Sequence, residues 1–190
     1  MVTPRRLGLF GGTFDPPHFG HVAALRAAAA TQNFDCIEVT VAGNPYLKSA
    51  TGPVRPAPLR LAMANADFAG LDLVRVSDRE IIREGPSYTI DTVRELLEEF
   101  DAVDVIVGAD LVGQIDSWHD ATHLQDLVRV GVVPRPGGSK AISPGWNCYE
   151  IAMEPVDLSS SFIRENSNSA ENLRKFVPES VIPLYESFQG

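Results

Sequence analysis

The chain has 190 residues, 44% of them hydrophobic, which suits a globular protein with one sizeable core. Its formal net charge of −9 argues against broad binding to nucleic-acid backbones, and no apolar run is long enough to cross a bilayer. The apolar stretch from Leu7 to Phe10 is too short for a signal peptide, so we expect a cytoplasmic protein. Cys36 and Cys148 lie in no CxxC pair, which predicts neither a disulfide framework nor a structural zinc site.

Apolar, β-branched segments alternate with helix-forming segments through the first part of the chain. Strands are predicted at Arg6–Phe10, which ends at a Gly-Gly turn, at Cys36–Ala42 and at Leu71–Val76. Helices are predicted at Phe19–Thr31, which is rich in alanine, and at Leu59–Phe68.

The same alternation continues in the second part of the chain. A helix is predicted at Ser87–Phe100, with Ser87 or Thr89 as its cap, and a short one at Leu124–Leu127. Strands are predicted at Val103–Val107, at Val128–Val133 and, from alternating exposure, at Tyr149–Glu154. Two short helices are expected to close the chain.

Two longer segments read as loops. Gly43–Pro58 contains four prolines, and Pro134–Asn147 is rich in proline, glycine and serine. The remaining alternation of strands and helices predicts an α/β fold, a Rossmann-like doubly wound and mostly parallel sheet. We expect a single domain over residues 1–190 with a small helical part from about 159 to 190. Ligands of such sheets bind at the carboxyl ends of the strands, where the strand order reverses.

The segment Gly11–His21, GGTFDPPHFGH, is the most specific motif of the chain. Gly11 and Gly12 allow a ligand to come close to the backbone, and the amides at the start of the next helix attract an anion. His18 and His21 are three residues apart, so both can share one face of that helix and donate hydrogen bonds to phosphate oxygens. A capped helix with two incidental histidines is the alternative. Because the chain has only four histidines, we favour a phosphate site.

This segment resembles the GGxFDPxHxGH signature of the HIGH-type nucleotidylyltransferases, and the whole chain is similar to the bacterial nicotinate-nucleotide adenylyltransferases among them. The further matching blocks are PSYTIDT at Pro86–Thr92, GAD at Gly108–Asp110, Trp118-His119, RPG at Arg135–Gly137 and SSSFIR at Ser159–Arg164. SSSFIR and the first motif are shared by the superfamily, whereas PSYTIDT and GAD with Trp118-His119 indicate the nicotinate branch.

The resemblance implies which residues bind each substrate. On the ATP side it implies the catalytic residues His18, His21 and Arg164 and the binding residues Gly12, Thr13, Phe14, Gly108, Asp110, Ser159, Ser160 and Ser161. On the side of nicotinate mononucleotide it implies Lys48, Tyr88, Thr89 and Trp118, the last stacked on the pyridine ring, with Arg135 as a further candidate. The chain departs mildly from the family pattern at Leu158 and Ser161, and more strongly around Lys48, where AGNPYLK replaces a form with Pro-Pro-His-Lys.

Elementary chemistry supports some of these roles and leaves structural alternatives for others. A serine-rich helix start with an arginine suits a phosphate, and a carboxylate after a strand suits ribose hydroxyls. Asp110 could equally cap a helix, Trp118 could belong to the core, and the serines could cap a helix. A few placed cations can attract an anion despite the negative net charge, and the candidates are Lys48, Arg55, Arg60, Arg135 and Arg164.

The reaction implied by the resemblance joins ATP and nicotinate mononucleotide into deamido-NAD and pyrophosphate. The acceptor phosphate attacks the α-phosphorus in line, so positioning and charge neutralisation carry the catalysis. We expect Mg²⁺ to arrive with the triphosphate and no dedicated metal site in the protein. Neither nucleic acid nor a membrane is an expected partner, and a homo-oligomer is left open.

Three other functions stay open. A related transferase could use the same phosphate site on nicotinamide mononucleotide, phosphopantetheine or a cytidylyl acceptor. An NAD-binding dehydrogenase fits poorly, because Gly8, Gly11 and Gly12 do not have the GxGxxG spacing. A catalytically silent nucleotide-binding homologue is the third alternative.

Overall fold

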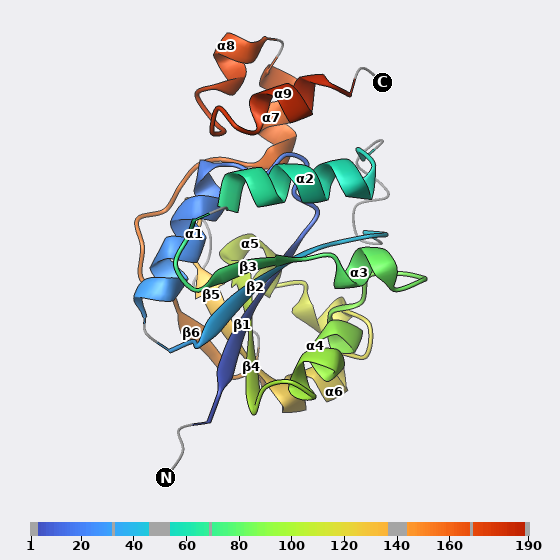
Figure 1. Ribbon diagram of the computed structural model, residues 1–190. Coiled ribbons are helices and arrows are strands. Elements are labelled where there is room, and N and C mark those ends of the chain that lie inside the picture. The colour runs from blue at the N-terminus through green and yellow to red at the C-terminus, as the bar shows by residue number, and fades with distance from the viewer. Residues whose placement is uncertain are drawn as a thin grey trace.

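A parallel sheet forms the centre of the computed structural model, which describes residues 4–31, 33–45, 54–68, 70–136, 144–167 and 169–188 (Figure 1). Its strands are β1 (Arg6–Gly12), β2 (Cys36–Val41), β3 (Val74–Ser77), β4 (Ala102–Gly108), β5 (Val128–Val133) and β6 (Cys148–Glu150). They lie in the order β3-β2-β1-β4-β5-β6, and all of their pairings are parallel. The chain moves outward from β1 to β3 and then returns to β4 on the other side of β1. The strand order therefore reverses between β1 and β4, as in a doubly wound Rossmann-like fold.

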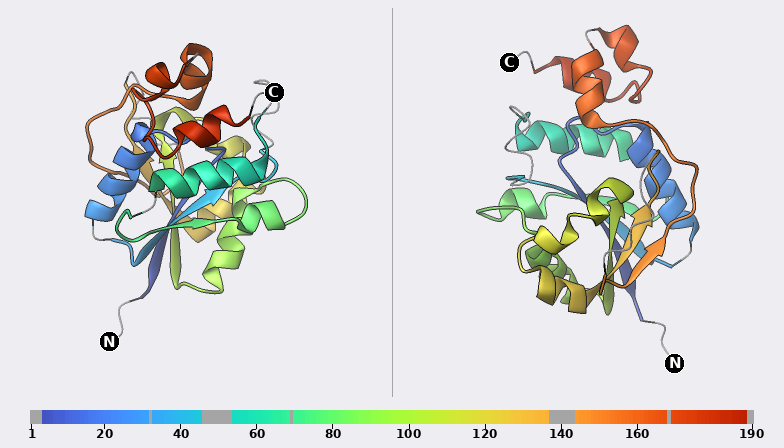
Figure 2. Two further views of the ribbon diagram at one scale, coloured as in Figure 1. Left: turned by 45° about the horizontal axis from the view of Figure 1, so that its top comes forward. Right: turned by 180° about the vertical axis from the view of Figure 1, so that it is seen from behind.

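Helices cover both faces of this sheet. The helices are α1 (Phe19–Ala30), α2 (Ala57–Phe68), α3 (Arg79–Ile82), α4 (Thr89–Leu97), α5 (Ala109–Val112), the 3-10 helix η2 (Ile115–Ser117), α6 (Ala121–Leu127), α7 (Ser160–Asn166), α8 (Ala170–Leu173) and α9 (Ile182–Glu186). Helices α1 and α2 cover one face, and α4 and α6 cover the other (Figure 1 and Figure 2). The last three helices gather beyond α2, at the end of the molecule opposite the N-terminus.

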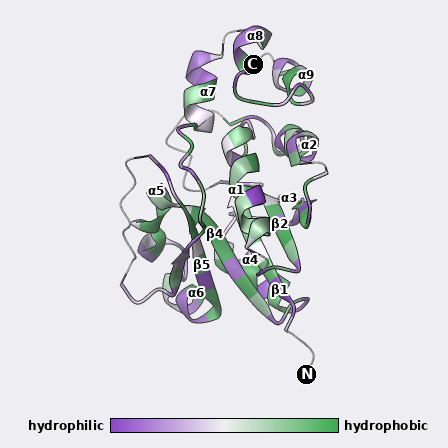
Figure 3. Ribbon diagram, turned by 90° about the vertical axis from the view of Figure 1, so that its left-hand side faces the viewer, coloured by the Kyte–Doolittle hydropathy of each residue, from purple (hydrophilic) through white to green (hydrophobic). Residues whose placement is uncertain are grey.

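The core follows from the alternation of side chains along the strands, which Figure 3 colours mainly as hydrophobic. In β1, Leu7 and Leu9 face α4 and α6, whereas Phe10 faces α1 and α2. A third apolar cluster joins Met63 of α2 to the C-terminal helices, including Tyr185 of α9. This cluster fixes the C-terminal helices to the sheet layer. Their separation as a small helical part of a single domain stays a prediction.

The buried carboxylates of the described residues are hydrogen-bonded, with one exception. Asp104 is fully buried in β4, where Arg129 and Tyr149 hydrogen-bond to its carboxylate. Asp67 of α2 is 7% exposed, yet neither of its carboxylate oxygens has a hydrogen-bond partner within the described structure. Burial raises the pKa of Asp67 to about 7, because no neighbouring charge offsets the loss of water.

The sequence predicted the α/β class and the order of the main elements correctly, and three details were wrong. The third strand begins at Val74 rather than Leu71, because the preceding residues turn and Leu73 adopts a left-handed φ of 63°. The last strand ends at Glu150, opposite Val132, because β5, its partner among the described residues, extends by just one more residue, to Val133. Three helices rather than two close the described chain, and the short α3 and α5 were not predicted.

Within the described residues, no helix is both long enough and apolar enough to span a membrane.

Candidate active site

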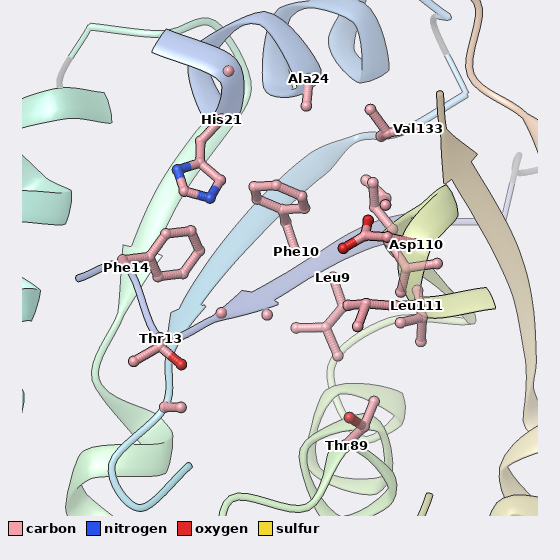
Figure 4. Close-up of a pocket in the computed structure, with 18 of the residues that line it drawn as sticks. Leu9, Phe10, Thr13, Phe14, His21, Ala24, Thr89, Asp110, Leu111 and Val133 are labelled. Carbon is pink, nitrogen blue, oxygen red and sulfur yellow. The ribbon is translucent and has the colours of Figure 1, made fainter. Parts of the chain in front are cut away.

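A cavity of about 340 Å³ opens at the carboxyl ends of β1 and β4, where the strand order reverses. His21 and Phe14 lie on one side of the end of β1, Asp110 lies on the other side, and Thr89 lies below (Figure 4). The position agrees with the expectation for a doubly wound sheet. Of the residues implied by the resemblance, those that line the cavity are Gly12, Thr13, Phe14, His21, Thr89, Gly108, Asp110, Trp118, Arg135 and Ser160.

The Gly-Gly turn continues β1 into a tight loop at the wall of this cavity. Gly11 has open space where a Cβ would stand, whereas a Cβ on Gly12 would lie 2.8 Å from Cζ of Phe14. Phe14 itself has a left-handed φ of 51° and is 2% exposed, so its ring packs back under the turn. The backbone of Gly11 therefore lines the cavity with open space beside it, whereas Gly12 packs tightly against the ring of Phe14.

The two histidines of the motif form a stacked pair. His18 is the N-cap of α1 and is 1% exposed, and its ring lies 3.7 Å from that of His21 between centroids, at an interplanar angle of 23°. The backbone N–H of His18 donates to Nδ1 of His21 over 3.2 Å. Since Nδ1 accepts this bond, the ring hydrogen of neutral His21 is on Nε2. The two residues share a helix face as predicted, but His21 lines the cavity and His18 lies behind it.

Arg60 and Arg55 hydrogen-bond to the loop that follows β1. Arg60 is 2% exposed and donates to the backbone carbonyls of Thr13 (2.8 Å), Arg55 (2.8 Å) and Gly43 (3.4 Å). Arg55 donates from Nη1 to Oδ1 of Asp15 over 2.9 Å and from its backbone N–H to Oδ2 over 3.1 Å. Burial lowers the pKa of Arg60. Two of the five cations that the sequence offered for a substrate, Arg55 and Arg60, are thus engaged by the protein itself, and neither lines the cavity.

Helix α7 brings the serine-rich block to the same loop, far away in sequence. Ser159 is its N-cap and accepts from the N–H of Phe162 over 3.1 Å, so the structural alternative holds for this serine. Oγ of Ser160 donates to the carbonyl of Pro16 over 2.8 Å. Arg164 donates from Nη1 to the carbonyl of Asp15 over 2.7 Å and from Nη2 to Oγ of Ser161 over 3.1 Å. Only Ser160 of this block lines the cavity, and the others flank it.

The end of β4 supplies the opposite wall. Gly108 is the N-cap of α5, and Asp110 lies in the first turn of that helix, so Asp110 is not the cap that the alternative required. Nε of Arg135 lies 3.7 Å from Oδ1 of Asp110. Arg135 also donates to the carbonyl of Leu158 over 2.7 Å, which ties β5 to the segment before α7. A carboxylate and a guanidinium therefore face the cavity together.

The start of α4 forms the far end. Thr89 and Trp118 line the cavity, and the ring of Tyr88 stacks on that of His119 with centroids 4.0 Å apart. The predicted cap is wrong, because the N-cap of α4 is Tyr88 and no side chain caps the helix. Trp118 packs against the core, yet its Nε1 is buried without a hydrogen-bond partner in the described structure. The structural alternative therefore holds for the ring of Trp118, which also lies at the edge of the cavity, and its stacking on a substrate ring stays a prediction.

Sequence reasoning missed two polar residues of this end. Glu80 and Ser87 line the cavity, and they are 7% and 9% exposed. Burial raises the pKa of Glu80, and hydrogen bonds from Thr92 and Ser87 act in the opposite direction. Ser87 lies in the PSYTIDT block that carries the family resemblance. Glu80 lies in helix α3, which is too short to show a hydrophobic periodicity in the sequence.

One predicted residue of the acceptor site could not be placed. Lys48 lies outside the described residues. Within the described part of the chain, no group of three or more His, Cys, Asp or Glu side chains could hold a metal ion.

Comparison with known proteins identifies the family of the chain. Residues 9–166 match the family model described as cytidylyltransferase-like. Two relatives carry the description "Probable nicotinate-nucleotide adenylyltransferase": one from Shouchella clausii is 35% identical over 96% of this chain and 94% of its own, and one from Exiguobacterium sibiricum is 34% identical over 96% and 97%. The nicotinic acid mononucleotide adenylyltransferase of Plasmodium falciparum, solved in complex with NaAD, has a TM-score of 0.82 at 17% identity over 96% of this chain and 95% of its own, so it shares the fold. The chain therefore belongs to the cytidylyltransferase-like family and, within it, to the nicotinate-nucleotide adenylyltransferases.

Proposed function

We propose that this protein transfers the adenylyl group of ATP to nicotinate mononucleotide, forming deamido-NAD and pyrophosphate in NAD biosynthesis. The observation that carries the proposal is a single cavity at the reversal of the strand order that is lined by His21, Asp110 and Trp118 together. These three residues come from motifs separated along the chain, and the fold gathers them around one space large enough for small molecules. The names of the relatives supply the choice of reaction.

The ATP phosphates belong between the start of α1 and α7 in this proposal. His21 presents Nε2–H, Gly11 leaves the backbone bare, and Ser160 and Arg164 approach from the other side. His21 and Arg164 are each held by another contact of the protein before substrate arrives, whereas the hydroxyl of Ser160 donates its one hydrogen to Pro16. Such preorganised donors stabilise charge that develops on phosphate oxygens during transfer.

The adenosine and the acceptor take the remaining walls. Asp110, beside Arg135, is placed for the ribose hydroxyls of ATP, after the end of β4. Trp118 and Thr89 hold the pyridine ring and its carboxylate, and Tyr88 and Lys48 complete the acceptor site. In this proposal the acceptor phosphate and the α-phosphate share one cavity, and proximity supplies most of the catalysis.

No residue of the site needs to form a covalent intermediate. The acceptor phosphate oxygen attacks the α-phosphorus, and pyrophosphate leaves toward His21 and Arg164. Mg²⁺ carried by the triphosphate would neutralise part of its charge. His18, behind His21, holds the catalytic ring in its orientation by stacking and through its backbone N–H.

A second acceptor is the main rival. Nicotinamide mononucleotide differs from the proposed acceptor by one charge, and phosphopantetheine lacks a ring to stack on Trp118. A cytoplasmic location and a homo-oligomeric state stay predictions from the sequence.

The test is pyrophosphate release from ATP with nicotinate mononucleotide, nicotinamide mononucleotide and phosphopantetheine in parallel, each repeated with CTP. We expect the highest kcat/KM for ATP with nicotinate mononucleotide. A preference for phosphopantetheine would overturn the roles of Trp118 and Thr89, and no turnover with any pair would support a silent nucleotide-binding homologue.

A further inference from the structure

We propose that Glu80 is a positioning residue for the acceptor: its buried carboxylate holds the start of α4 and the loop after β2 at the spacing that the acceptor requires. The inference rests on the proposed function, because it concerns the end of the cavity assigned to nicotinate mononucleotide. In this proposal Glu80 does not touch the reacting atoms.

The first support is the set of hydrogen bonds around the carboxylate. Oγ1 of Thr92 donates to Oε1 of Glu80 over 2.6 Å, and the side chain of Ser87 also hydrogen-bonds to Glu80. Thr92 lies in the first turns of α4, and Ser87 precedes the helix by two residues. The carboxylate of Glu80 is therefore hydrogen-bonded to a residue on each side of Thr89, which lines the cavity.

The second support is the bridge from Ser87 to the loop after β2. The N–H of Ser87 donates to the carbonyl of Asn44 over 3.1 Å, and the N–H of Asn44 donates to Oγ of Ser87 over 3.2 Å. Next to Asn44, a Cβ on Gly43 would collide with the backbone carbonyl of Glu80, so helix α3 is seated directly on this loop. Glu80 is thus the point at which three segments of the cavity wall meet.

Third, a neighbouring arginine holds Thr92, the hydrogen-bond donor to Glu80, in place. Arg83 donates to Oγ1 of Thr92 over 3.0 Å and to Oε1 of Glu95 over 2.6 Å. Since Thr92 is fully buried and Glu80 nearly so, the geometry has little freedom to relax. Loss of the carboxylate would leave the hydroxyl of Thr92 facing a small gap and would free the start of α4.

The experiment compares Glu80→Ala, Glu80→Gln and the exposed control Glu84→Ala, four residues along the chain. The wild type is assayed first, and its failure to use nicotinate mononucleotide would count against the proposed function and not against this inference. With an active wild type, we expect Glu80→Ala to raise the KM for the acceptor about 10-fold while the KM for ATP changes less than about 2-fold. Glu80→Gln, which keeps one accepting oxygen, should recover most of the loss, and Glu84→Ala should match the wild type.

Ser87→Ala provides a second route if Glu80→Ala does not fold. It removes the hydroxyl that joins Glu80 to Asn44, and we expect the same rise in the acceptor KM alone. Equal rises in both KM values, or a lower melting temperature with unchanged KM values, would overturn the positioning role. So would a failure of Glu80→Gln to recover activity beyond that of Glu80→Ala.

Discussion

The ring of His18 lies flat against the ring of His21, and the backbone N–H of His18 fixes Nδ1 of His21 as an acceptor. One histidine is thereby turned into a support for the other. His21 meets the cavity, while His18 is almost fully buried. The same residue type, three positions apart, should thus behave in two different ways when it is replaced.

We expect His21→Ala to lower kcat for adenylyl transfer by about 10²- to 10³-fold, the loss typical of one donor to a developing negative charge. The melting temperature should change little, because the ring lies at the cavity wall. His18→Ala should instead lower the free energy of unfolding by about 1–3 kcal/mol, since it removes a buried ring. Pyrophosphate release and thermal denaturation of both variants separate the two effects. Near wild-type turnover by His21→Ala would show that the proposed mechanism is wrong.

Arg164→Lys should lower kcat by about 10-fold or more with a folded protein. Arg164 holds the carbonyl of Asp15 and Oγ of Ser161 with two nitrogens of one planar group, and the single ammonium of lysine cannot reproduce that fork. Arg174→Lys is the matched control, because Arg174 pairs with Glu179 at the surface. Steady-state kinetics of the two variants decide the matter, and equal activities would remove Arg164 from the site.

Gly11→Ala and Gly12→Ala should separate binding from folding. A Cβ on Gly11 enters open space beside the cavity, so we expect unchanged stability and a raised KM for ATP. A Cβ on Gly12 must displace the buried ring of Phe14, and we expect a loss of about 1–3 kcal/mol of stability. Denaturant unfolding and ATP titration check both variants. A stable Gly12→Ala would show that the ring moves freely.

Asp67 should make stability fall as pH rises. Its pKa is about 7 in the folded protein, against an ordinary value of 3.8, so the folded state holds a proton that the unfolded state has released. The penalty therefore grows between about pH 4 and pH 7 and is complete above it. Asp67→Asn removes the charge, and we expect it to be more stable than the wild type by on the order of 4 kcal/mol at pH 8. The difference should shrink toward pH 5 in denaturant unfolding, and a gap that does not depend on pH would refute the assignment.

Much of the fold and part of the site could be predicted, because their signals are local. The alternation of apolar strands and helices predicted a doubly wound sheet, and the motif with the Gly-Gly turn and two histidines supplied Gly11, Gly12 and His21 of the cavity wall. The roles of Arg60 and Glu80 could not be predicted. Their partners lie on other segments of the chain, and the sequence alone does not distinguish a buried arginine or glutamate from an exposed one. The sequence also could not show that His18 lies away from the cavity. A spacing of three residues places both histidines on one helix face, but it does not show which of the two the rest of the protein buries.

Helix α7 brings contacts to the first motif from near the end of the chain. Its contacts with Asp15 and Pro16 join residues that are 149 and 144 positions apart. A chain emerging from the ribosome can build most of the sheet before this helix exists, and the first motif then lacks the partners that hold its carbonyls. Truncated or nascent chains should thus have a nearly finished sheet and no competent phosphate site until the last part of the sequence is made.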